Sequence, residues 1–356
     1  MHAPSLRSNP ISCNCVSNTD RTMHAPSFWW RNPGVEAALL APLAWLYGTV
    51  AVRRLHRSGA RAAVRVVCVG NPTVGGAGKT PASIALANLL RTAGEAPVFL
   101  TRGYGGRLAG PALVDVALHS AAEVGDEPLL LAQHFTTIVA HDRPAGAAMA
   151  VSAGASVIVM DDGFQNPSLI KDVAILVVDA RRGIGNGRVF PAGPLRSPLA
   201  DQLAKAHALL IVGDGENAGP VQDAAQARGL SVFFAGLRPD PDVCAALQAT
   251  KVLAFAGIGD PDKFFATLDV AGIVAPVRRG FADHHRYTPG DATRLLDESA
   301  ANDLTLLTTE KDRARMQGDP GLAELRHRAK ILPVSLVLKD ADGMQRFLLA
   351  RVRPSA

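Results

Sequence analysis

Residues 66–80 read VVCVGNPTVGGAGKT, and this stretch decides the fold. Val66–Val69 is a short apolar run typical of a buried strand, and Ala82–Leu90 carries helical periodicity. The residues between them match the pattern G-x-x-x-x-G-K-[ST], except that Thr73 replaces the first glycine. A strand, a glycine loop ending in Lys-Thr and a helix together predict a phosphate-binding loop. Its members are Thr73, Val74, Gly75, Gly76, Ala77, Gly78, Lys79 and Thr80.

The chemistry of this loop follows from its residue types. Its glycines let backbone N–H groups close around phosphate oxygens, and the following helix N-terminus favours negative charge. Lys79 is expected to reach the β- and γ-phosphates of a nucleotide, and the Thr80 hydroxyl to bind Mg²⁺. A glycine-rich turn followed by Lys-Thr by chance is the alternative, and it does not explain the strand and helix on either side.

A second apolar run, Val157–Met160, ends in the acids Asp161 and Asp162. An acidic strand end places carboxylates at the edge of a parallel sheet, beside a phosphate loop. We therefore expect Asp161 and Asp162 to complete the Mg²⁺ site with Thr80. A turn or helix-capping role for these acids is the alternative.

Phosphoryl transfer also needs positive charge near the migrating group and a base for the acceptor hydroxyl. The candidate cations are Arg102, Arg143, Arg188 and Arg196. The candidate bases are Asp126, Glu127, His284 and His285. From spacing alone, each arginine could equally be a surface residue and the histidine pair could be structural. An Asp–His couple could instead share a proton and strengthen a base.

Further apolar runs alternate with helical patterns, which predicts an α/β protein with a parallel sheet covered on both faces. The first set is Val98–Leu100, Ile138–Ala140, Val157–Met160 and Ala174–Val178. The second set is Ala208–Val212, Val232–Ala235, Val252–Ala256, Leu304–Leu307 and Ile331–Val334. We expect a phosphate-loop core over residues 59–200 and a second, smaller α/β domain over residues 201–356, with the boundary near 198–206.

The N-terminal region has a different character. The string MHAPS occurs at residues 1–5 and 23–27, so residues 1–27 are predicted to be a disordered or non-native extension, with Met23 the expected start. Residues 28–58 contain the apolar run Ala37–Val52, all three tryptophans and a basic end. This composition predicts a membrane-associated helix, and whether it spans the bilayer or lies at its surface stays open. A buried core helix is the alternative.

Composition narrows the class of protein. The 356 residues are 48% hydrophobic and 19% charged, which is ample for a buried core. The net charge of +5 is mild, so we expect no nucleic-acid partner, and nothing indicates an obligate protein partner. None of the four cysteines has zinc-site or C-x-x-C spacing, and a disulfide framework is not expected, as in a reducing compartment.

Taken together, the ordered motifs of residues 28–340 resemble the tetraacyldisaccharide 4′-kinase family, the lipid A 4′-kinases. The motifs are VGNPTVGGAGKTP (69–81), TRGYGG (101–106), GDEPLLLA (125–132), DDGFQNPSL (161–169), RGIGNGRVFPAGPLR (182–196), AFAGIGDPDKFF (254–265), FADHHRYT (281–288) and LTTEKD (307–312). The resemblance implies transfer of the γ-phosphate of ATP to the 4′-hydroxyl of a tetraacyldisaccharide 1-phosphate, giving lipid IVA. It also implies a site at the cytoplasmic face of the bacterial inner membrane.

Residue roles carry over by motif. The resemblance implies that residues 73–80 bind ATP and that Asp126 is the general base, assisted by His284 or His285. Arg143 becomes a phosphate or substrate contact, and Arg102 and Glu127 are expected to be such contacts too. Two positions depart from the family pattern: Asn166 replaces a histidine and Ser197 replaces a glutamate. No catalytic role is assigned to either.

Three other functions fit this sequence less well than a lipid kinase does. A membrane-associated ATPase switch is the main alternative, but such proteins carry a lysine early in the glycine loop, where this chain has Val74. A GTPase is disfavoured because its N-K-x-D pattern is not matched by Glu310-Lys311-Asp312. A non-catalytic nucleotide-binding protein would not need to keep the reactive set Lys79, Thr80, Asp126, Asp161 and Asp162.

Overall fold

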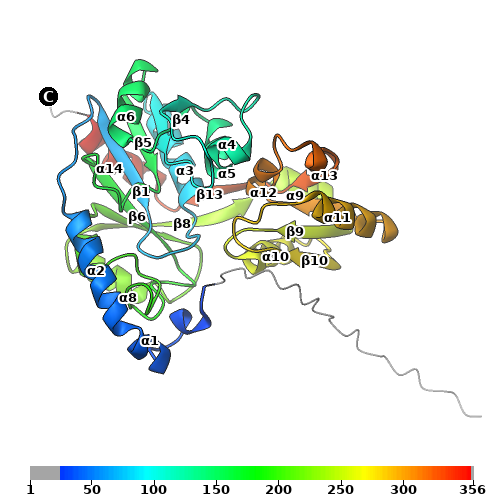
Figure 1. The fold of residues 1–356 in the computed structure, drawn as a ribbon, viewed down its shortest axis with the longest axis horizontal. Coiled ribbons are helices and arrows are strands. Elements are labelled where there is room, and N and C mark those ends of the chain that lie inside the picture. Colours follow the sequence, from blue (N-terminus) through cyan, green and yellow to red (C-terminus); the bar gives the residue numbers. More distant parts are fainter. Residues whose placement is uncertain (1–24, 354–356) are drawn as a thin grey trace, which may run out of the picture.

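The computed structural model describes residues 25–353, and the strands of this part form two separate sheets (Figure 1). The large sheet contains β1 (Arg65–Gly70), β2 (Pro97–Thr101), β3 (Ala112–Leu113), β4 (Thr137–Val139), β5 (Val157–Asp161), β6 (Val173–Asp179), β7 (Ala208–Val212), β8 (Ser231–Pro239) and β13 (Val334–Leu338). Their order is β13-β8-β7-β6-β1-β5-β2-β4-β3. Neighbours run parallel except in the two edge pairs, β13–β8 and β3–β4. The predicted parallel α/β sheet is therefore confirmed.

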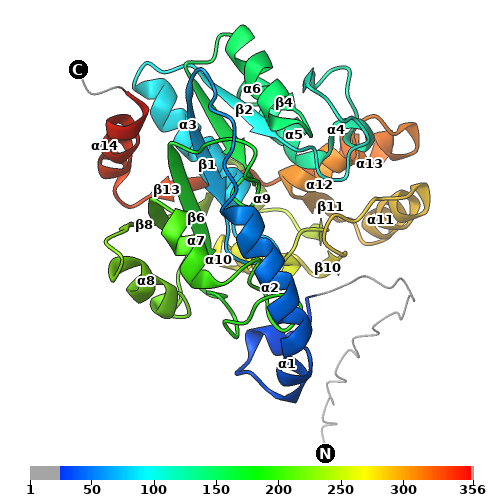
Figure 2. The same ribbon diagram turned by 60° about the vertical axis from the view of Figure 1, so that its left-hand side comes forward.

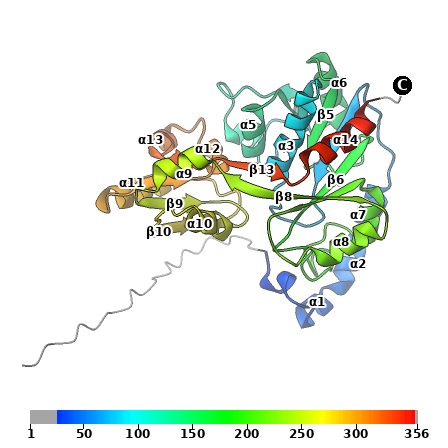
Figure 3. The same cartoon turned by 180° about the vertical axis from the view of Figure 1, so that it is seen from behind.

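Helices cover both faces of the large sheet. One face packs against α3 (Lys79–Thr92) and α14 (Ala341–Val352), which lie side by side in Figure 3. The other face packs against α6 (Arg143–Ser152), α7 (Leu199–Lys205) and α8 (Gly219–Gln226). Strand β1 shows why both faces need cover. Val67 and Val69 pack toward α3 and α14, and Val66 and Cys68 pack toward α6, α7 and α8; all four are fully buried. Apolar side chains on both faces require such double cover.

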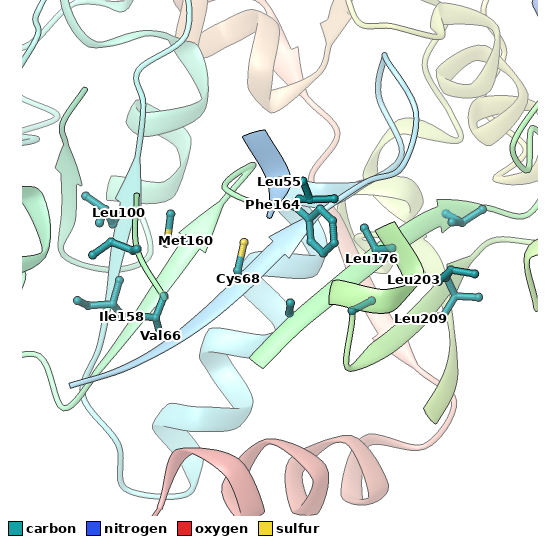
Figure 4. Packing of buried hydrophobic residues seen from close by; sticks show 14 of the residues in the cluster. Leu55, Val66, Cys68, Leu100, Ile158, Met160, Phe164, Leu176, Leu203 and Leu209 are labelled. Atoms are coloured by element: carbon teal, nitrogen blue, oxygen red, sulfur yellow. The ribbon is translucent and has the colours of Figure 1, made fainter. Parts of the chain in front are cut away.

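The core also anchors two functional segments. Figure 4 shows Leu55, at the end of the N-terminal helix, and Phe164, from the DDGFQ motif, packed in the same cluster as Cys68 and Leu176. A Cβ on Gly70 would lie 2.3 Å from the Cβ of Phe164, so glycine is required there. The loop after β5 is therefore pinned against the end of β1, which is where the phosphate loop starts.

The second sheet forms a smaller domain beside the first (Figure 1). Its strands are β9 (Val252–Ala256), β10 (Val277–Gly280), β11 (Thr305–Thr308) and β12 (Lys330–Ile331), in the parallel order β10-β9-β11-β12. Its helices are α9 (Pro241–Leu247), α10 (Pro261–Val270), α11 (Pro289–Ala301), α12 (Glu310–Arg315) and α13 (Ala323–Arg328), with a 3₁₀ turn, η2 (Pro320–Leu322). Two buried apolar clusters cover the two faces of this sheet.

The expected domain boundary near 198–206 is wrong. Strands β7 and β8 continue the large sheet, and the chain returns to it in β13 and α14. The smaller domain is thus an insertion of roughly residues 240–333, not the whole of 201–356. The predicted strand Ile331–Val334 straddles this return: Ile331 ends β12 in the small sheet and Val334 begins β13 in the large one. Apolar runs alone do not reveal which sheet a strand joins.

At the N-terminal end, a 3₁₀ turn, η1 (Ser27–Trp30), precedes α1 (Val35–Leu39) and α2 (Ala41–Leu55), which lie at the surface in Figure 2. One face of α2 packs on the protein through Ala44 and Leu55, and Tyr47 meets Phe190 edge-on at 5.2 Å. Among residues 25–353, no helix is both long and apolar enough to cross a membrane. Residues 1–24, with Cys13, Cys15 and Met23, lie outside the described range; Cys68 and Cys244 are buried free thiols.

Two short helices, α4 (Ala121–Val124) and α5 (Asp126–Ala132), lie between β3 and β4. Helix α5 begins directly after Gly125 and packs against α12 of the inserted domain. The contact between α5 and α12 therefore joins the two domains at the edge of the large sheet.

Candidate active site

Most predicted site residues of the large domain follow the carboxyl ends of four neighbouring parallel strands, whereas Asp126 and Glu127 begin α5. The phosphate loop follows β1, Asp161 ends β5 with Asp162 directly after it, Arg102 follows β2 and Arg143 follows β4. These strands are adjacent in the order β1-β5-β2-β4. Ligands of open parallel sheets bind at this edge. The topology thus brings together the phosphate loop and Asp161, which are 81 or more positions apart in the chain, with Arg102 and Arg143 on the strands beside them.

The phosphate loop has the backbone form that phosphate binding needs. Gly75 and Gly78 have φ values of +103° and +83°, a region that favours glycine. Gly78 immediately precedes α3, so the loop leads into a helix N-terminus. The Asn71 side chain donates to the carbonyl of Gly75 at 3.0 Å, and the Val74 amide donates to the carbonyl of Pro194 at 2.8 Å. The loop is therefore held from both sides.

Lys79 and Thr80 face the acidic end of β5. Lys79 Nζ lies 3.7 Å from Asp162 Oδ2, and Thr80 Oγ1 lies 3.4 Å from Asp161 Oδ2. Arg196 Nη2 also approaches Asp162 Oδ2, at 3.3 Å, while its Nε donates to the carbonyl of Thr73 at 2.9 Å. Lys79 and Arg196 thus both pair with the carboxylate of Asp162 beside the loop. The same two cations are placed to bind phosphate oxygens instead.

The environment of Asp161 fits a divalent cation. Asp161 is buried, and burial together with the negative charges of Glu127 and Asp162 raises its pKa to about 7. A cation beside Asp161 would relieve this excess negative charge. Carboxylate and hydroxyl oxygens are the ligands that Mg²⁺ prefers, and Mg²⁺ takes only one or two carboxylates alongside water and phosphate. Among residues 25–353, no group of three or more His, Cys, Asp or Glu side chains is placed to hold a metal ion.

Asp126 and His284 meet across the two domains. Asp126 begins α5 and is buried, and His284 lies after β10 in the inserted domain. The His284 Nδ1 is 3.4 Å from Asp126 Oδ2. Burial would raise the pKa of Asp126, but its hydrogen bond to His284 and the charges of Arg315 and Lys311 outweigh burial and hold the pKa well below its usual range. The hydrogen bond to Asp126 in turn raises the pKa of His284.

His285, which sequence could not separate from His284, points elsewhere. Its Nε2 lies 3.1 Å from Asp291 Oδ2, and its ring stacks on Phe281 with centroids 4.7 Å apart. Both partners belong to the inserted domain. The backbone at His284 has a positive φ of +56°, which helps to turn the side chains of His284 and His285 in different directions. Only His284 therefore joins Asp126, and His285 is a packing residue of its own domain.

Glu127, the acid next to Asp126 in the sequence, is influenced by the charges of two lysines. Lys311 Nζ is 2.6 Å from Glu127 Oε1, and the charge of Lys79 also helps lower the pKa of Glu127 against the effect of burial. Arg315, four residues after Lys311 on α12, contacts Asp126 through Nε at 2.6 Å. Sequence reasoning assigned no role to Lys311 or Arg315. The i, i+4 spacing of two cations opposite two adjacent acids was the available signal.

Arg143 is almost fully buried at the start of α6, and two of its nitrogens, Nε and Nη1, have no hydrogen-bond partner among the described residues. Burial lowers the pKa of Arg143 to about 10, with a smaller contribution from the charge of Arg102, which is itself exposed. Arg143 lines a cavity of about 700 Å³ with three arginines of the N-terminal helix region. The cavity residues are Val50, Arg53, Arg54, Arg57, His141, Asp142, Arg143, Pro144, Asn166, Pro167 and Ser168.

The two departures from the family pattern lie in different places. Asn166 lines the cavity, and its Oδ1 accepts from the Ser168 hydroxyl at 2.6 Å. Ser197 is fully buried next to Arg196, and its Oγ has no partner among the described residues. Arg188, the last of the candidate cations, is exposed in the loop before α7, and no side-chain contact within the described part of the chain places it at the site.

Comparison with known proteins agrees with this geometry. Residues 36–353 match the sequence profile of the family described as tetraacyldisaccharide-1-P 4′-kinase. The tetraacyldisaccharide 4′-kinase of Rhodopseudomonas palustris (strain BisA53) is 53% identical over 330 residues, covering 93% of this chain and 96% of that protein. That of Methylobacterium nodulans is 54% identical over 335 residues, covering 94% and 97%. The crystal structure of LpxK from Aquifex aeolicus in complex with ATP superposes with a TM-score of 0.69 at 26% identity, covering 89% of this chain and 99% of that one.

Proposed function

The chain belongs to the tetraacyldisaccharide-1-P 4′-kinase family, and from that premise we propose how its residues perform the reaction. The chain transfers the γ-phosphate of ATP to the 4′-hydroxyl of the lipid A disaccharide precursor, which gives lipid IVA. This reaction needs a phosphate cradle, a proton acceptor for the hydroxyl and a place for the lipid headgroup. The ATPase-switch alternative has no counterpart in the family match.

The meeting of Asp126 with His284 is the observation that carries the mechanism. We propose that His284 accepts the proton of the 4′-hydroxyl, because its side chain is about one-third exposed (34%) while that of Asp126 is only 5% exposed. A buried carboxylate with a depressed pKa is a weak base, whereas an imidazole titrates near neutral pH. Asp126 then orients the imidazole and stabilises its protonated form. This assignment moves the base from Asp126, where the family resemblance put it.

The nucleotide end of the reaction is assigned to the phosphate loop. Residues 73–80 supply backbone N–H groups, and Lys79 and Arg196 supply positive charge where it opposes the transferred phosphoryl group. Thr80, Asp161 and Asp162 would hold Mg²⁺ at the acidic strand end. When bound there, the ion would neutralise part of the charge of the phosphate groups.

We assign the arginine-lined cavity to the 1-phosphate of the acceptor. Arg143 contributes two buried nitrogens without partners, and a buried unpaired donor is costly unless an anion binds it. Arg53, Arg54 and Arg57 line the same cavity. The cavity also includes Asn166, four residues after the metal-site acid Asp162, so the headgroup of a bound lipid would lie between the basic helix end and the reactive centre.

The outer face of α1 and α2 is proposed to lie on the cytoplasmic face of the inner membrane. It exposes a set of large apolar side chains: Val35, Leu39, Leu43, Trp45, Leu46, Tyr47 and Val50. Because the opposite face of α2 is packed on the protein, the helix would rest in the interface with its axis along the membrane surface. The following arginines would meet anionic headgroups.

The test is a transfer assay. The purified chain, Mg²⁺ and ATP labelled at the γ-phosphate are mixed with tetraacyldisaccharide 1-phosphate in detergent micelles. The label should move to the lipid, and the Lys79→Ala variant should abolish transfer. Release of free phosphate at a rate that ignores the lipid would contradict the proposed function.

A further inference from the structure

Arg315 occupies the junction of the two domains. Its side chain is only 6% exposed, and its Nε lies 2.6 Å from Asp126 Oδ2. Its Nη1 donates to Asp312 Oδ1 at 2.9 Å and also to the carbonyl of Gly257. One guanidinium therefore touches a carboxylate of the large domain and two acceptors of the inserted domain. A planar fork with fixed donors suits such a joint, which a lysine ammonium would not reproduce.

The acceptors on the inserted domain are themselves fixed. Asp312 is fully buried and accepts from the Gly257 amide and from the Tyr287 hydroxyl, each at 3.0 Å. The Gly257 carbonyl that Arg315 contacts also accepts from the backbone N–H of His284, at 3.1 Å. Arg315 thus reaches both members of the reactive pair. It holds Asp126 through the side chain and His284 through the carbonyl that anchors the backbone of His284.

We propose that Arg315 is a positioning residue for phosphoryl transfer, which sets the Asp126–His284 pair in register across the domain junction. The inference rests on the proposed role of that pair. Because Arg315 is buried and its contacts are with Asp126, Asp312 and the carbonyl of Gly257, it would act through Asp126 and His284. Its neighbour Lys311 pairs with Glu127 instead and forms a separate contact between the same two helices.

The charges around Asp126 and His284 predict how the pH–rate profile should change when Arg315 is replaced. Asp126 is faced by Arg315 and Lys311 from α12, by His284 from the loop after β10, and by Glu127 on its own helix. His284 is faced by Asp126, Asp283 and Arg315, and the ring of Tyr104 meets it edge-on at 5.3 Å. Removing the positive charge of Arg315 favours protonation of both Asp126 and His284. The acidic limb of the pH–rate profile should therefore move to higher pH.

The experiment compares Arg315→Gln and Arg315→Lys with the wild-type enzyme. Arg315→Gln is expected to lower kcat at least tenfold, since a misplaced base loses about 10²-fold, while KM for ATP changes less than about threefold. The acidic limb of its kcat profile should move to higher pH. Arg315→Lys retains the charge but not the fork, so its limb should return toward the wild-type position while kcat stays reduced.

Arg313→Gln is the matched control, because Arg313 lies on the same helix and has no ion pair or side-chain hydrogen bond within residues 25–353. It should leave kcat and the pH profile unchanged. Thermal melting and ATP binding report whether each variant is folded. If both Arg315 variants lost kcat equally and the acidic limb of the pH profile did not move, Arg315 would have only a folding role. If Arg315→Gln had wild-type kinetics, Arg315 would have no role in positioning the pair. Failure of the wild-type enzyme to label the lipid would instead overturn the proposed function.

Discussion

His284 Nδ1 lies 3.4 Å from Asp126 Oδ2, although the two residues are 158 positions apart and belong to different domains. The reactive pair exists only while the inserted domain is seated on the large one. The contact between α5 and α12 seats it there, through Arg315 on Asp126 and Lys311 on Glu127. The chemistry of the site is therefore coupled to the docking of the domains.

Replacing Asp126 with asparagine should lower kcat by about 10²- to 10⁴-fold, the usual contribution of acid–base catalysis. An amide cannot stabilise the protonated imidazole, but it keeps the shape of the carboxylate. ATP affinity should stay within about threefold, because the phosphate loop is untouched. Single-turnover transfer and equilibrium ATP binding measure the two quantities separately. An equal loss of turnover and ATP affinity would exclude a role confined to the proton transfer.

The two adjacent histidines should behave differently. His284→Ala should lower kcat by a factor similar to Asp126→Asn, with little change in melting temperature. His285→Ala removes the ring that stacks on Phe281 and contacts Asp291, so it should lower the melting temperature and leave most of kcat. Kinetics and calorimetry on the two variants form a matched pair. The reverse pattern would assign the base to the other histidine.

Activity should fall with acidification through the pKa of His284. The hydrogen bond to Asp126 raises this pKa above its ordinary value of 6.5, which outweighs the opposing effect of burial. A protonated imidazole cannot accept the hydroxyl proton, so the loss should begin at a pH above 6.5. NMR titration of the His284 ring should show the raised pKa, and Asp126→Asn should move it lower. An unchanged titration in that variant would dissociate the two groups.

Arg143 should recognise the phosphate of the acceptor. Arg143→Gln is expected to raise KM for the lipid by about 10- to 150-fold, which corresponds to the roughly 1.5–3 kcal/mol of a hydrogen bond to a charged group. With an acceptor that lacks the 1-phosphate, the wild-type and variant enzymes should have similar KM values. Arg228→Gln, at an exposed arginine beyond α8, is the control. A loss that is the same for both acceptors would place Arg143 elsewhere in the mechanism.

The apolar face of α2 should govern binding to vesicles. The double variant Trp45→Ser, Leu46→Ser should reduce partition into anionic vesicles about tenfold or more, since each large apolar side chain contributes about 1.5–3 kcal/mol when buried. Val270→Ser is the control, because Val270 is 91% exposed on the inserted domain, away from α2. Flotation with vesicles measures the partition. Equal recovery of all forms would count against a membrane role for this face.

Local signals in the sequence predicted much of the fold. The strand β1, the phosphate loop and the acidic end of β5 follow from apolar runs, glycines and the adjacent acids, which are short-range features. The domain boundary did not follow, since the strand patterns of β7 and β8 fit either sheet. The extent of the large domain becomes clear only because the chain returns to the large sheet in β13. In the sequence, the apolar residues of β13 look like a continuation of β12 across Pro333.

For the candidate site, sequence could name Asp126 and the two histidines but could not choose between His284 and His285. Neighbouring residues in an irregular loop have no periodicity to sort them, and the choice depends on the positive φ at His284. Arg315 was missed for a related reason. Its partner Asp126 lies 189 positions away, and only the docked helices α5 and α12 bring the two together.

The inserted domain leaves the large sheet after β8 and rejoins it in β13, its direct neighbour. A segment whose two ends are adjacent can be exchanged as a cassette without rethreading the rest of the chain. Evolution, or a protein engineer, can therefore vary the module that delivers His284 while the nucleotide cradle is inherited intact. In this architecture the nucleotide site and the proposed proton acceptor, His284, lie in parts of the chain that can change independently.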